Sequence, residues 1–115
     1  MNQKEYLLVQ AASECMEVAH RITKALHFGL DEVQPGQELT NADRIAGELL
    51  DLFATLEMLE DAGIISNPCD PGAVRAKKAK VTKFMAYAQT CGTLDTEPTS
   101  ANPAGIEPAS AKETP

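Results

Sequence analysis

The sequence predicts an all-α fold with three main helices, and three observations lead to this prediction. Long stretches repeat apolar residues at alternating steps of three and four, which is the period of a helix with one buried face. Aromatic residues make up only 4% and Trp is absent, so Leu, Ile, Val, Ala and Met must form the core, a composition that suits helices. Candidate caps and glycine stops delimit each stretch.

The first helix is expected between Asn2 and Phe28. Asn2 followed by Glu5 fits an N-cap with its capping-box partner, and Gly29 fits the C-terminal stop. The periodicity predicts that this helix buries Leu8, Ala11, Cys15, Val18, Ile22 and Ala25.

A loop is expected at residues 30–39, which contain a Pro-Gly pair and several polar groups. Thr40 or Asn41 then caps a second helix that runs to about Ala62, and Gly63 supplies its end. Its predicted buried positions are Ala42, Ile45, Leu49, Leu52, Leu56 and Leu59.

A third helix is expected to begin after an Asp-Pro pair at residues 70–71 and to end at Cys91, where Gly92 is the stop. Beyond it the composition changes to Thr, Ser, Pro, Ala and Glu, which offer little to bury. We therefore expect one all-α domain at 1–92, followed by a flexible low-complexity tail at 93–115 without a catalytic role.

Charge and composition limit the possible partners and the compartment. The net charge of −7 argues against nucleic acid or an anionic membrane as a partner. No apolar run approaches the roughly 18 residues of a membrane span, and the N-terminus lacks a signal-peptide pattern. Three widely spaced cysteines, at positions 15, 69 and 91, indicate thiols in a reducing compartment, so we expect a cytoplasmic protein.

Two short motifs place carboxylates side by side on the first two helices. Glu14 and Glu17 are three residues apart, as are Glu48 and Asp51. A shift of 34 residues superimposes the two predicted apolar stripes, and the same shift lays Glu14 on Glu48 and Glu17 on Asp51. Both pairs therefore bear the same relation to the buried face of their helix.

Four carboxylates that converge in this way would repel one another unless a hard cation lay between them. Mg²⁺ suits such a site, because it prefers carboxylate and water ligands and leaves positions for phosphate oxygens; Mn²⁺ is a possible substitute. The alternative interpretation is two solvated surface motifs in matching phase by chance. A di-iron carboxylate bundle is disfavoured, because neither motif contains the expected ExxH.

These residues resemble the MazG-like, all-α nucleoside triphosphate pyrophosphohydrolases, whose signature is ExxE, a spacer and ExxD. The phage-type branch is the most similar: the stretch KALHFGL at 24–30 and the Thr-Asn pair at 40–41 match its pattern. The resemblance covers roughly Glu5 to Leu59, and the third helix matches only in its Lys-rich character. The long spacer between Glu17 and Glu48 departs from the pattern and leaves the placement of the loop open.

The resemblance implies a Mg²⁺-dependent hydrolase that releases pyrophosphate from a nucleoside triphosphate and leaves the monophosphate. It implies a helical homo-oligomer, in the host cytoplasm if the chain is encoded by a phage. Glu14, Glu17, Glu48 and Asp51 would be its metal ligands and catalytic residues. Three helices alone make a small core, which also favours a homodimer or homotetramer that completes a helical bundle.

Lysines are candidates for contacts with the phosphates. Lys24 follows the first acidic motif along one polar face, and its alternative role is an intrahelical ion pair. Lys77, beside Lys78, lies in register with the apolar stripe of the third helix and is expected to face inward, toward the carboxylates and phosphates. The alternative is that Lys77 extends its ammonium from the edge of the stripe into solvent.

Other candidate contacts concern the base and the entry to the second helix. Phe28 and Tyr87 could each stack on a base, although both could equally be core or rim residues. Asn41 could contact the substrate or cap its helix. The competing function, from a different class, is a non-enzymatic helical module whose acidic face binds a partner protein.

Overall fold

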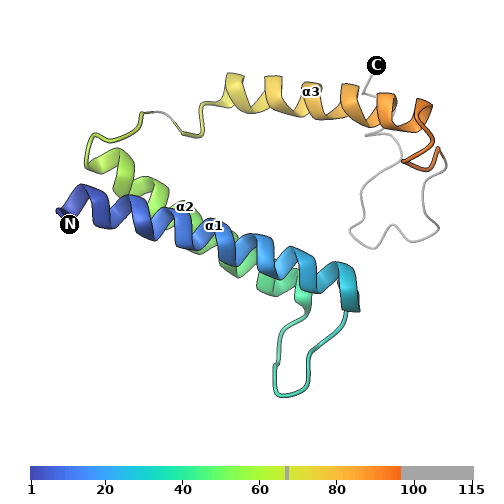
Figure 1. Ribbon diagram of the computed structural model, residues 1–115, viewed down its shortest axis with the longest axis horizontal. Helices are drawn as coiled ribbons and strands as arrows, with labels where there is room; N and C mark the ends of the chain where they lie inside the picture. Colours follow the sequence, from blue (N-terminus) through green and yellow to red (C-terminus); the bar gives the residue numbers. More distant parts are fainter. Residues whose placement is uncertain (67, 97–115) are drawn as a thin grey trace. The chain divides into compact units, whose positions relative to one another are not determined.

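A computed structural model describes residues 1–66 and 68–96 of the chain, and these residues form the three predicted helices. Helix α1 spans Gln3–Phe28, α2 spans Asn41–Asp61 and α3 spans Pro71–Thr90 (Figure 1). No strand occurs within the described residues, so the prediction of an all-α fold is confirmed. None of these helices combines the length and apolar character that a membrane crossing requires.

The chain divides into two units, Met1–Pro68 with α1 and α2, and Cys69–Pro115 with α3. The boundary predicted after residue 92 falls inside the second unit, and the division into a domain and a tail stays a prediction. Most of the predicted tail, residues 97–115, lies outside the described residues.

Both ends of α1 follow the signals in its sequence. The Asn2 side chain accepts a hydrogen bond from the Glu5 amide at 2.8 Å, and the Glu5 carboxylate accepts one from the Asn2 amide at 3.4 Å, which completes the capping box. At the other end Gly29 adopts a φ of 103° and donates its amide to the Ala25 carbonyl at 2.8 Å. Residues with side chains rarely adopt this φ, so glycine ends the helix here.

Helices α1 and α2 form an antiparallel hairpin (Figure 1), and Asn41 fixes the connection between them. Asn41 is only 3% exposed, and its amide nitrogen Nδ2 donates to the Gly29 carbonyl and to Glu32 Oε1, each at 2.8 Å. Thr40 is the N-cap, with its hydroxyl accepting from the Asp43 amide at 3.1 Å. Asn41 therefore serves the fold as a loop anchor, a role that the sequence did not suggest, and both Nδ2 hydrogens are engaged within the chain.

The face along which α1 and α2 pack agrees with the predicted stripe at seven of its twelve positions, which are buried or half-buried. The predicted positions that are exposed instead are Leu8, Cys15, Ile22, Ala42 and Leu49. The buried or half-buried stripe, which we call the seam, again follows steps of four and three. Its members are Leu7, Ala11, Glu14, Val18, Arg21 and Ala25 on α1, and Asn41, Ile45, Glu48, Leu52, Thr55 and Leu59 on α2.

Helix α3 begins as predicted, with the Asp70 carboxylate accepting from the Ala73 amide at 2.9 Å and Pro71 in the first turn. It contains five basic residues and no acidic one, and none of its residues is buried. Lys77 is exposed within the second unit, and the prediction that it faces the carboxylates and phosphates stays a prediction.

Candidate metal centre

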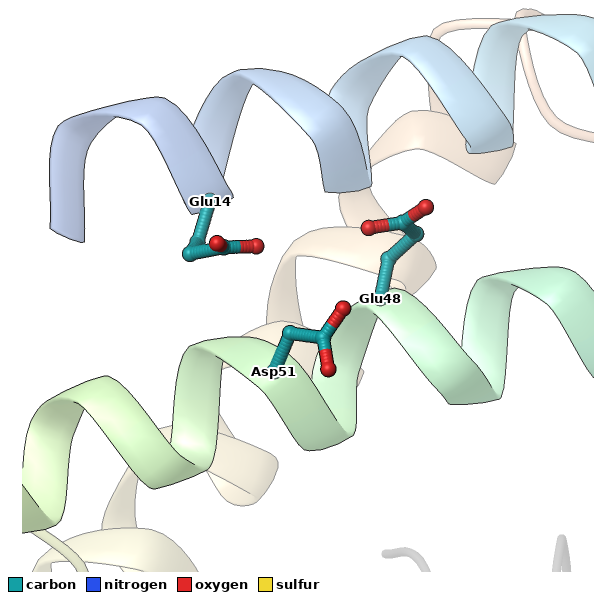
Figure 2. A group of neighbouring side chains, drawn as sticks. All are labelled: Glu14, Glu48 and Asp51. Carbon is teal, nitrogen blue, oxygen red and sulfur yellow. The ribbon is translucent and has the colours of Figure 1, made fainter. Parts of the chain in front are cut away.

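Three of the four predicted ligands come together across the hairpin. Glu14 descends from α1 toward Glu48 and Asp51 of α2, and the three carboxylates face a common space (Figure 2). One oxygen from each carboxylate can be chosen so that all three atoms lie within 4.8 Å of one another. The antiparallel pairing brings the two helices together here, and the three-residue spacing places Glu48 and Asp51 on the same side of α2.

The positions of these carboxylates in the fold distinguish them from ordinary surface acids. Glu14 and Glu48 are half-buried seam residues, whereas Asp51 is exposed at the edge of the hairpin. The other seam positions near them hold aliphatic residues such as Ala11, Val18 and Leu52. Moving a carboxylate out of water has a free-energy cost, so the two half-buried carboxylates and their close approach to Asp51 make this group the candidate site.

The spacing of the carboxylates fits a divalent cation with oxygen ligands. Ligand oxygens on opposite sides of a Mg²⁺ ion lie about 4 Å apart, and those around Ca²⁺ about 5 Å apart. The chosen carboxylate oxygens of Glu14, Glu48 and Asp51 lie within 4.8 Å of one another, a bound that suits a divalent cation and does not distinguish Mg²⁺ from Ca²⁺. Three protein ligands would leave coordination positions for water or for phosphate oxygens.

Glu17, the fourth predicted ligand, is not part of this group. Its side chain is exposed on α1, three residues beyond Glu14. Asp51 has the same three-residue spacing from Glu48 and does join the group, so the spacing alone does not explain the position of Glu17. Its role as a ligand stays a prediction.

Gln10 belongs to the site, although the sequence analysis missed it. Its side-chain nitrogen Nε2 donates a hydrogen bond to Glu14 Oε1 at 2.9 Å, and the residue is half-buried. Among the described residues, neither Glu48 nor Asp51 has a comparable side-chain partner. The signal was the spacing: Gln10 precedes Glu14 by four residues, which places both on one helix face.

Lys24 and Phe28 contact each other near the end of α1. The Lys24 ammonium lies 5.8 Å from the centroid of the Phe28 ring, a cation–π distance. His27 meets the same ring edge-on, with centroids 5.8 Å apart. Phe28 is 59% exposed and Lys24 is half-buried, so both stay accessible, and their proposed contacts with base and phosphate stay predictions.

The remaining predicted contact residues, Lys77, Lys78 and Tyr87, are exposed on α3 in the second unit. Lys77 lines an open groove of about 460 Å³ along this helix, beside Val81 and Phe84. The groove belongs to the second unit alone. Whether these residues contact a substrate stays a prediction.

Comparisons with protein-family models, with curated proteins and with solved structures find no match for this chain. A functional interpretation therefore depends on the motifs of this sequence and on the geometry of the carboxylates. The resemblance to MazG-like enzymes stays at the level of those motifs.

Proposed function

We propose that this protein is a Mg²⁺-dependent nucleoside triphosphate pyrophosphohydrolase, which converts a ribo- or deoxyribonucleoside triphosphate and water into the monophosphate and pyrophosphate. The observation that carries the proposal is the group formed by Glu14, Glu48 and Asp51 at the packing face of two helices. The resemblance of the ExxE and ExxD motifs to those of MazG-like enzymes supports the choice of reaction. Mn²⁺ is expected to replace Mg²⁺.

In this mechanism the carboxylates of Glu14, Glu48 and Asp51 would hold the cation at the edge of the hairpin, where exposed Asp51 leaves the site open to solvent and substrate. A bound Mg²⁺ supplies charge neutralisation for the triphosphate and promotes ionisation of the attacking water. One carboxylate of the acidic motifs accepts the proton that this water loses as it attacks the α-phosphorus. Lys24, half-buried on α1, is the candidate for contact with the phosphate tail.

The proposal includes a homodimer or homotetramer. Among the described residues no side chain is fully buried, so the hairpin alone lacks a closed core. It also exposes a second set of uncharged side chains, each one residue after a seam position, which we call the outer stripe. The outer stripe consists of Leu8, Cys15, Ile22, Leu26, Leu49 and Phe53.

A second hairpin placed on the outer stripe would complete a four-helix bundle. In an antiparallel helix pair, residues one position after a seam residue lie on one side of the hairpin. Residues three positions after a seam residue, such as Asp51, can lie on the opposite side. Self-association through the outer stripe therefore leaves the carboxylates accessible.

The exposed thiols of Cys15, Cys69 and Cys91 support the proposed cytoplasmic location, where thiols stay reduced.

The test is pyrophosphate release from a panel of nucleoside triphosphates, with and without Mg²⁺. Glu48→Gln should abolish release and leave the far-UV helicity intact, because it removes a ligand charge and keeps the shape of the side chain. Glu57→Gln is the matched control, since Glu57 is exposed on the same helix and outside the carboxylate group. Unchanged turnover in Glu48→Gln would remove this residue from the site.

The competing proposal is a non-enzymatic helical interaction module whose acidic face binds a partner protein, and the exposed carboxylates of Glu17 and Asp51 favour it. The two proposals differ in their response to Mg²⁺. An ion that binds only the folded state raises the melting temperature, whereas an interaction module without a metal site gains nothing and releases no pyrophosphate.

A further inference from the structure

We propose that Gln10 is a positioning residue for the metal centre, which holds Glu14 in the orientation that binds the divalent cation. This inference rests on the proposed function, since it requires a cation at Glu14, Glu48 and Asp51. It adds a residue outside both acidic motifs, and it concerns the affinity of the site for the metal ion.

The geometry of the contact is suited to this role. Gln10 Nε2 donates to Glu14 Oε1 at 2.9 Å, so one carboxylate oxygen is held by the chain and the second stays available for a cation. An amide donor carries no charge and leaves the negative charge of Glu14 in place for the metal. A lysine at position 10 would hold the carboxylate equally well but would repel the cation.

Glu14 is also the ligand whose orientation matters most. It is the only member of the group on α1, and the other two ligands lie together on α2. A glutamate side chain loses rotamer entropy when it is fixed. If Gln10 fixes the Glu14 side chain before the cation binds, less entropy is lost on binding and the free energy of binding is more favourable.

Hydrogen-bonding partners of metal ligands affect metal affinity by roughly 10- to 100-fold. Gln10→Leu, which keeps a side chain of similar size without the donor, should therefore raise the dissociation constants of Mg²⁺ and Mn²⁺ at least about tenfold. Isothermal titration calorimetry on the intact chain measures both constants. Gln10→Asn is the second variant: its amide is one methylene shorter and should not reach Glu14, and its polarity protects the fold.

The control is Gln3→Leu, which removes an exposed glutamine from the same helix and should leave both dissociation constants unchanged. The melting temperature of each metal-free variant separates loss of positioning from loss of folding, because positioning affects the dissociation constants alone. Wild-type affinity in both Gln10 variants, or an equal loss in Gln3→Leu, would overturn the role of Gln10 and leave the metal site standing. A wild-type chain that binds neither ion would overturn the proposed function, and this inference with it.

Discussion

Glu14 and Glu48 occupy positions where a pair of packed helices ordinarily buries aliphatic side chains. Both are half-buried, and each is separated from the next apolar seam residue by three or four positions. An apolar side chain at either position would stabilise the fold by about 25 cal/mol for each Å² of apolar surface it buried, and a carboxylate does not. A bound cation would offset this loss, because it attracts the carboxylates that otherwise repel one another.

Asn41 shows the opposite case, a polar residue whose burial is explained by the fold. Replacing it with alanine removes both Nδ2 hydrogen bonds and leaves the Gly29 carbonyl and Glu32 without their donor. We expect Asn41→Ala to lower the free energy of unfolding by about 1–3 kcal/mol, measured by urea denaturation. Gln37→Ala, an exposed change in the same loop, should stay within about 0.5 kcal/mol of the wild type. Equal stability of the two variants would contradict the anchoring role.

Two glycines differ in backbone conformation but have equally open surroundings. Replacing each with alanine therefore tests how backbone conformation affects the stability of the helices. A Cβ atom added at Gly29 or at Gly47 meets no other atom within 4 Å. Gly29 has a φ of 103°, so Gly29→Ala should lower the free energy of unfolding by about 1–3 kcal/mol. Gly47 lies inside α2, so Gly47→Ala should raise it by about 0.5–1 kcal/mol. Thermal unfolding of both variants would show shifts of opposite sign, and shifts of the same sign would refute this explanation.

The helices themselves could be predicted from the sequence because their signals are local. Asn2 with Glu5, Asp70 before Pro71, and the glycine stop at Gly29 each act within one turn of backbone, and all are found where expected. The carboxylate group could also be predicted in part. Glu14, Glu48 and Asp51 follow from helix phase, but Glu17 does not join them in the structure.

The packing face could be predicted only in part, because α1 and α2 each carry two adjacent stripes that share some positions and differ by one residue at the others. Leu7 and Leu8 illustrate the ambiguity: they are neighbours of equal hydrophobicity, yet Leu7 is 8% exposed and Leu8 is 48% exposed. The choice between them depends on how two helices pair, and that pairing is not encoded within either helix alone. The Asn41 anchor was hidden for the same reason, since its partners lie 9 and 12 residues away.

At the scale of the whole molecule, the outer stripe predicts self-association. We expect the wild-type chain to sediment as a dimer or tetramer, and Phe53→Glu to sediment as a smaller species, because burying a new charge opposes the contact. Phe53 is 51% exposed, so the substitution leaves the packing of the single chain largely unchanged. Val33→Glu, at an exposed loop residue, is the control and should sediment as the wild type. A wild-type monomer at every concentration would contradict the expected assembly.

The proposed function depends on whether Glu14, Glu48 and Asp51 together bind a divalent cation. The most direct measurement is the melting temperature of the wild type and of Glu14→Gln across a titration with MgCl₂, at constant ionic strength set with KCl. At a concentration 100 times the dissociation constant, specific binding adds about 2.7 kcal/mol to the stability of the folded state. We expect a saturable rise in the melting temperature of the wild type and no such rise in Glu14→Gln. A melting temperature that does not change with Mg²⁺, or one that rises equally in both proteins, would contradict this expectation.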